Sequence, residues 1–192
     1  MADGRDDHRD SMSRMPSHVA FLRAVNLGGH RSAPRADLRG ALEAAGFSQV
    51  DTFRASGNVV LTARGGERRI GQAIEETLAG RLGFSVVVYL RSARELRRLI
   101  DHAAGMRPAP APGGKLQVAF LRASPSAPER EEVLRRSTDD DLLAFSDREM
   151  LWLRRQPAGR SALNLRALEK LIGPWTMRTM DTVTQIVVRY FD

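Results

Sequence analysis

Two short segments of this 192-residue chain combine residue types that bind anions. One contains Arg23, Asn26 and Gly28-Gly29, and the other contains Ser56-Gly57-Asn58. Paired glycines let backbone N–H groups approach an anion, and an arginine guanidinium adds a forked positive charge. The pattern predicts a pocket for a small anionic or polar ligand. A structural role is favoured for the same residues: the glycines turn the chain, Asn58 completes a hairpin, and Arg23 pairs with a carboxylate.

Two further candidates for anion binding lie in the C-terminal part of the chain, Arg160-Ser161 and Arg178. Ser161 stands shortly before a run of leucines at helical spacing, which predicts either a helix N-cap or an anion site at the helix terminus. The cap is the favoured alternative, and Arg178 beside Thr182 has a similar ambiguity. The Gly-Gly pair matches neither G-x-x-x-x-G-K-[ST] nor G-x-G-x-x-G, so a nucleotide-binding loop is not indicated.

Neither a metal site nor a cofactor is predicted. The chain has no cysteine, which excludes a disulfide framework, a thiol nucleophile and a thiolate metal site. The four histidines are scattered without the spacing of metal ligands. Asp139-Asp140-Asp141 is more typical of a solvated turn than of a cation site.

The apolar pattern predicts the elements that must position the first candidates. A loop of glycines separates a strand from a helix, a tight hairpin follows, and a second helix leads into a buried strand. In chain order we expect a strand over 19–27, a helix through Leu38 and Leu42, a hairpin around 56–58, a helix from Ile70 to its stop at Gly83, and a strand over 85–90. The order is β-α-β-β-α-β, the ferredoxin-like motif.

The chain then repeats itself, because the hexapeptide VAFLRA occupies 19–24 and again 118–123. A capping box at Ser126–Glu129, a hairpin around 146–148, a leucine-rich helix, a short extended piece and a terminal helix over 181–191 follow the second copy. We therefore predict an α/β (α+β) protein of two tandem ferredoxin-like β-α-β-β-α-β domains plus a C-terminal helix. The expected boundaries are a disordered leader over 1–16, a first domain over 17–106 with a trailing helix that Ser92 caps, a linker over 107–115 and a second domain over 116–192.

Composition bounds the class of protein. Hydrophobic residues make up 42% of the chain, enough for a packed core, and no run is long enough to cross a bilayer. A cytoplasmic protein is expected. The formal charge of +7 invites a nucleic-acid partner, yet basic residues occur in pairs and not in long runs. Solvated helix faces are the favoured explanation.

Several blocks of the sequence resemble the bacterial family designated domain of unknown function 1697: VAFLRAVNLGG at 19–29, FRASGNVV at 53–60, Gly159-Arg160-Ser161, and Arg178 with Thr182-Val183. The resemblance covers about 19–191 and implies two ferredoxin-like domains, but no activity. The chain departs from the family at Ala24, usually glycine, at Ala55, often glutamine, at Ala162, often lysine, and at Thr179-Met180, usually Asn-Trp. Relatives that use those polar side chains to bind a ligand would differ from this protein there.

The fold geometry brings the first candidates together, because parallel first and second strands place the loop that leaves the first strand at the same end of the sheet as the hairpin. Arg23, Asn26 and Gly28-Gly29 should therefore face Ser56-Gly57-Asn58. We expect a non-enzymatic binder of a small anionic or polar ligand, or of a protein partner, acting as a monomer or homodimer. An acylphosphatase-like hydrolase using Arg23 and Asn58 is an alternative by analogy of fold. Nucleic-acid binding is a second alternative, and NVVLTA lacks the aromatics of an RNA-recognition strand.

Overall fold

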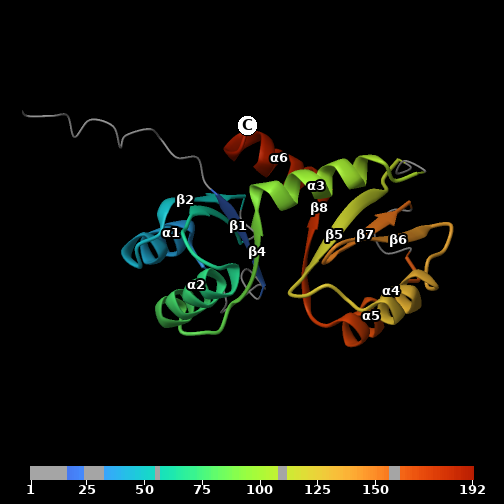
Figure 1. The fold of residues 1–192 in the computed structure, drawn as a ribbon, viewed down its shortest axis with the longest axis horizontal. Helices are drawn as coiled ribbons and strands as arrows, with labels where there is room; N and C mark the ends of the chain where they lie inside the picture. The colour runs from blue at the N-terminus through green and yellow to red at the C-terminus, as the bar shows by residue number, and fades with distance from the viewer. Residues whose placement is uncertain (1–16, 24–32, 55–56, 108–111, 156–160) are drawn as a thin grey trace, which may run out of the picture.

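The computed structural model describes residues 17–23, 33–54, 57–107, 112–155 and 161–192, which form two halves (Figure 1). The predicted leader over 1–16 lies outside the described residues. The elements of the first half are β1 (His18–Arg23), α1 (Arg35–Ala44), β2 (Ser48–Phe53), β3 (Asn58–Thr62), α2 (Glu67–Leu82), β4 (Val87–Ser92) and α3 (Ala93–Ala104). Those of the second half are β5 (Lys115–Leu121), α4 (Ala127–Leu134), β6 (Asp141–Ser146), β7 (Glu149–Arg154), α5 (Leu165–Ile172), β8 (Trp175–Thr179) and α6 (Met180–Tyr190).

Each half contains a four-stranded sheet, ordered β2-β3-β1-β4 in the first half and β6-β7-β5-β8 in the second. Every neighbouring pair of strands is antiparallel, so β1 and β2 run parallel with β3 between them, as expected. The two VAFLRA copies form equivalent strands, since β1 and β5 are each flanked by the third and fourth strands of their own half. The prediction of an α+β chain is confirmed, with two four-stranded antiparallel sheets.

Local signals account for most helix boundaries. Gly83 ends α2 in the left-handed conformation, with φ of 73°. Capping boxes begin α3 at Ser92 and α4 at Ser126, as predicted. The prediction that Ser161 caps α5 is wrong, because Asn164 accepts the hydrogen bond from the third residue of the helix. The Ser161 hydroxyl instead donates to the Asp141 carboxylate at 2.9 Å.

The helices that connect strands within a half cover the outer face of its sheet. In the first half, α1 and α2 pack on one face through Leu38, Leu42, Ile74 and Leu78. In the second half, α4 and α5 do the same through Val133 and Leu168. The other faces of both sheets belong to one shared core, in which β1, β5, α3 and α6 all contribute buried side chains.

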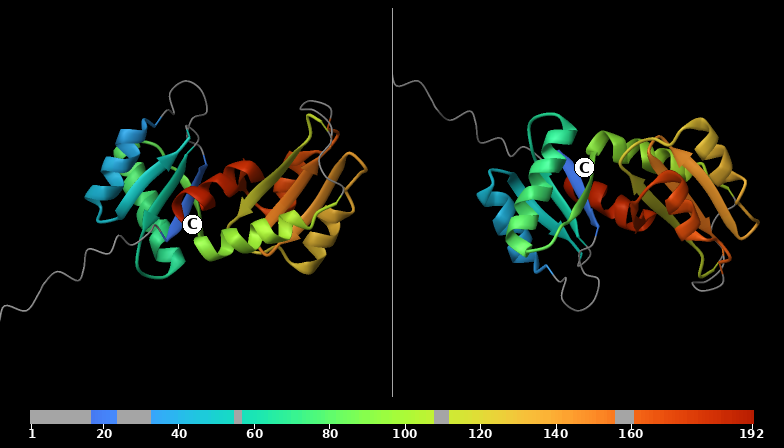
Figure 2. Two further views of the ribbon diagram at one scale, coloured as in Figure 1. Left: turned by 90° about the horizontal axis from the view of Figure 1, so that it is seen from above. Right: turned by 90° about the horizontal axis from the view of Figure 1, so that it is seen from below.

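The helices α3 and α6 each leave their own half and cover the other one. Figure 2 shows α6 running from the second half back along the first sheet, and α3 running from the first half alongside β5. Tyr190 of α6 donates to Asp51 of β2 at 2.6 Å and packs edge to face on Phe53. Neither sheet is therefore buried by its own half alone.

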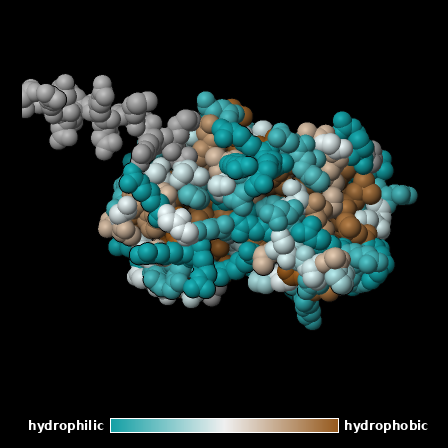
Figure 3. Space-filling view, viewed as in Figure 1, coloured by the Kyte–Doolittle hydropathy of each residue, from teal (hydrophilic) through white to brown (hydrophobic). Residues whose placement is uncertain are grey.

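The repeated strands meet at the centre of the molecule. The rings of Phe21 and Phe120, which hold the same position in the two VAFLRA copies, stack with centroids 4.0 Å apart. A contact between equivalent residues is what a local twofold rotation between the halves would produce. Figure 3 shows the boundary between the halves as a hollowed, largely hydrophilic surface.

Candidate functional site

Three of the predicted site residues, Gly57, Asn58 and Arg178, come together at the boundary of the halves. Asn58 begins β3 and is fully buried, and Arg178 lies in β8 of the other half. The Arg178 Nε donates to the Asn58 side-chain oxygen at 2.5 Å, while Nη2 donates to the carbonyls of Gly57 and Leu22 at 3.3 and 3.0 Å. Asn58 donates in turn to the carbonyl of Phe53 at 3.0 Å, which closes the β2–β3 hairpin.

Arg178 is held by the protein itself. Its Nη1 donates to Thr176 Oγ1 at 2.9 Å and to the Met177 carbonyl at 2.7 Å, and its guanidinium lies over the ring of Phe21. Burial disfavours the charged form and lowers the pKa of the Arg178 guanidinium to about 10. Because oxygen atoms of both halves accept hydrogen bonds from this side chain, its arrangement joins the halves.

Arg91 of β4, in the first half, forms the matching arrangement toward the second half; it is fully buried, whereas Arg178 is half-buried. Arg91 donates to the Leu121 carbonyl at 2.7 Å and forms a short ion pair with Glu149. Leu121 and Glu149 hold the positions of Leu22 and Asn58 in the repeat, so each half inserts one arginine into the other. Burial lowers the pKa of Arg91 and raises that of Glu149, although their attraction opposes both shifts.

Arg23, the first predicted residue, forms an ion pair across the boundary. Its Nη1 donates to Glu169 of α5 and, at 2.9 Å, to the carbonyl of Trp175. This agrees with the structural role expected for Arg23, pairing with a carboxylate. Arg122 is its counterpart in the second VAFLRA copy and pairs with Glu75 of α2.

The remaining predicted residues are not gathered into this arrangement. Ser161 lies at the second sheet, where it and Trp152 both donate to Asp141. Asp141 is buried, so the expectation of a solvated turn for the acidic run is wrong at this residue. Other predicted residues lie outside the described part of the chain: Asn26, Gly28, Gly29, Ser56 and Arg160.

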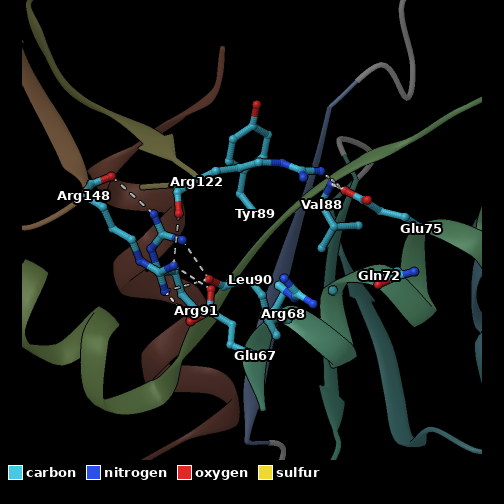
Figure 4. A pocket seen from close by; sticks show the side chains of 11 residues that line it. Glu67, Arg68, Gln72, Glu75, Val88, Tyr89, Leu90, Arg91, Arg122 and Arg148 are labelled. Atoms are coloured by element: carbon cyan, nitrogen blue, oxygen red, sulfur yellow. Dashed lines mark hydrogen bonds and ion pairs between the residues drawn. The ribbon is translucent and has the colours of Figure 1, made fainter. Parts of the chain in front are cut away.

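A cleft of about 780 Å³ opens between the halves, and we call it the arginine cleft (Figure 4). One wall is α2 with Glu67, Arg68, Gln72 and Glu75, and the floor is the edge strand β4 from Val88 to Arg91. The second half closes the other side with Arg122 and Arg148. Figure 4 shows Arg122 reaching across one end to Glu75, and Arg148 and Arg91 gathered at the other end around Leu90.

The charges of the arginine cleft are unevenly balanced. Four arginines and two glutamates line it. Arg148 is tied down by Glu67 and Glu95 at 2.6 and 2.7 Å, and Arg122 by Glu75. Arg68 is exposed, and among the described residues no carboxylate lies within ion-pair distance of it. Arg68 can therefore attract an anion to the cleft while the ion pairs of Arg122 and Arg148 stay intact.

Sequence reasoning missed this cleft, although a signal for it exists. Arg91 and Arg178 each stand directly before a helix N-cap, Ser92 and Thr179, so extending the repeat past VAFLRA aligns them. The same alignment pairs Arg23 with Arg122. The arginine cleft and the boundary around Arg23 are thus equivalent surfaces of the two halves.

Among the residues that the structure describes, no three histidine, aspartate or glutamate side chains are grouped so as to hold a metal ion. No helix there is both long and apolar enough to cross a membrane.

Comparisons with known proteins give a family and a fold. The family model described as a protein of unknown function, DUF1697, matches residues 15–151. No curated protein matches the sequence. A solved structure of the conserved bacterial protein SP0830 from Streptococcus pneumoniae is similar, with a TM-score of 0.68 and 18% identity over 91% of this chain and 98% of that one. At this identity the likeness establishes the fold alone.

Proposed function

We propose that this chain, which belongs to the DUF1697 family of proteins of unknown function, binds an anionic ligand in the arginine cleft. The observation that carries the proposal is the pair of arginines from opposite halves, Arg68 and Arg122, at one open cleft. Low-dielectric walls strengthen the attraction of such a cleft for anions, and guanidinium groups bind carboxylates and phosphates through paired hydrogen bonds. A volume near 780 Å³ suits a small ligand or a short peptide segment.

The cleft supports this function better than the surface first predicted from the sequence. Arg23 is engaged by Glu169, and Asn58 by Arg178 and the Phe53 carbonyl. The acylphosphatase-like alternative requires Arg23 and Asn58 to act on a substrate, and their contacts give it no support. The RNA-binding alternative is likewise unsupported, because the residues of β3 are non-aromatic and mostly buried.

We further propose that the two units are ferredoxin-like domains over 17–106 and 116–192, joined by a linker at 107–115, of which the last residue, Lys115, already belongs to β5. The strand orders and the helices on one face of each sheet favour this classification. A cytoplasmic location and a monomeric or dimeric state remain part of the proposal.

Calorimetric titration with citrate at low ionic strength tests the function. We expect Arg68→Ala and Arg122→Ala each to weaken citrate binding about tenfold, the effect of losing one charge-assisted hydrogen bond. Arg39→Ala is the matched control, since Arg39 is an exposed arginine of α1 paired with Glu43 and remote from the cleft lining. Equal weakening in all three variants would mean that citrate responds only to net charge, and the proposed site would be wrong.

A further inference from the structure

The floor of the arginine cleft is an open sheet edge. In the order β2-β3-β1-β4, strand β4 has β1 on one side only. The amide of Ala93 donates to the Ser17 carbonyl of the strand leading into β1. Residues at odd positions of β4 therefore bond toward β1, and Val88 and Leu90 direct their backbone groups outward into the cleft.

Val88 and Leu90 together direct four backbone groups outward, an N–H and a carbonyl each, and side chains bind two of the four. The Val88 N–H donates to Glu75 Oε1 at 2.8 Å. The Leu90 carbonyl accepts from Arg91 at 2.7 Å and from Arg148 at 3.4 Å. Between these two blocks the edge presents the Val88 carbonyl and the Leu90 N–H, one acceptor and one donor spaced as in a sheet. This pair matches the backbone of an added strand.

We propose that the ligand of the arginine cleft is an extended acidic peptide segment that pairs with β4 at Val88 and Leu90. The inference rests on the proposed function and adds the class of ligand. Main-chain pairing supplies the orientation, and Arg68 and Arg122 on the two walls supply the preference for acidic side chains.

Glu75 supports a carboxylate as the charged group of that segment. Its carboxylate bridges the Val88 N–H and Arg122, so the cleft already accommodates this group at the strand edge. An incoming carboxylate competes with Glu75 for Arg122. Glu169, which pairs with Arg23 in the equivalent position of the other half, is outside the lining of the cleft.

The opposite edge of the first sheet, formed by β2, is less suited to such pairing. The register of β2 with β3 shifts between Ser48 and Asp51, and Gln49 has φ of 51°, which bends this edge. Within β2, Asp51 accepts from the Thr52 N–H at 2.7 Å. The β4 edge has regular pairing over its whole length and faces positive charge.

The test uses the full chain and the peptide acetyl-Glu-Val-Glu-Val-Glu-amide, titrated by calorimetry. Two derivatives carry one N-methyl group each, on adjacent residues, with unchanged charge. Because successive N–H groups of a strand point in opposite directions, one methylation should weaken binding about tenfold and the other should leave it nearly unchanged. Glu75→Gln should tighten binding of the parent peptide about threefold, while Glu169→Gln should not.

Each result has a distinct meaning. Equal affinities for the parent and both methylated peptides would refute strand pairing, even if Arg122→Ala abolishes binding. Citrate binding without peptide binding would overturn the peptide inference and leave the proposed function standing. Failure of both citrate and peptide to bind would overturn both.

Discussion

Arg178 joins the two halves, and its truncation gives the strongest test of the fold's energetics. Three of its hydrogen bonds cross from the second half to the first, reaching Asn58, Leu22 and Gly57. At roughly 1 kcal/mol net for each bond, Arg178→Ala should lose about 3 kcal/mol of unfolding free energy, before any cost of the void. In Arg178→Ala the Leu22 carbonyl still accepts a hydrogen bond from the Thr176 hydroxyl. The loss of unfolding free energy should therefore stay close to this value of about 3 kcal/mol.

Urea denaturation followed by circular dichroism measures this loss, with Arg23→Ala as the matched variant. Arg23 also pairs across the boundary, but its side chain is 37% exposed, so solvent screens the pair and we expect about 1 kcal/mol. A loss for Arg178→Ala no larger than that for Arg23→Ala would refute this account of Arg178. A second transition in Arg178→Ala would show that the halves had become uncoupled.

Three further expectations follow from the same contacts. Burial and the Asp51 hydrogen bond raise the pKa of Tyr190 to about 12, and burial also raises that of Tyr89, so tyrosinate absorbance should stay low through pH 10 and appear there only in urea. Burial would raise the pKa of Glu95, but the hydrogen bonds from Ser92 and Arg148 outweigh burial and lower this pKa below 4.5. The carboxylate therefore stabilises the fold above pH 4.5, and this stabilisation is lost as the pH falls through the lowered pKa of the folded state. The Glu95→Gln variant should therefore be less stable than the parent at pH 7 and lose less unfolding free energy on acidification. The same decrease in both proteins between pH 7 and pH 3 would contradict this. Proteolytic cleavage within 107–115 should leave both pieces in one particle on size exclusion until urea is added, because α3 and α6 each cover the other half.

The order of elements was predictable because it depends on local signals. Gly83 stops a helix by its left-handed conformation, and Ser92 and Ser126 each bond the third residue of the helix they cap. The cap at Ser161 failed for a tertiary reason, since the Ser161 hydroxyl donates its hydrogen bond to the buried Asp141 carboxylate. No local pattern distinguishes a serine that caps a helix from one recruited by a distant carboxylate.

The candidate site was predictable only in part. A carboxylate partner for Arg23 could be expected, but Glu169 lies 146 residues away in the other half, and sequence spacing does not encode that contact. The meeting of Asn58 with Arg178 was missed for the same reason. Both contacts join the two halves, and the meeting of the halves depends on how the apolar faces of two sheets are buried in one core.

The central claim is that an anion binds at the edge of β4 between the halves, and backbone amide shifts measured by NMR during a citrate titration test it most directly. The account predicts saturable shifts at Val88, Leu90 and Arg122, with the shifts at Val88 and Leu90 requiring about tenfold more citrate to saturate in Arg122→Ala and unchanged in Arg39→Ala. Saturable shifts confined to Gly57, Asn58 and Arg178, with Val88 and Leu90 unmoved, would contradict it and return the site to the surface first predicted from the sequence.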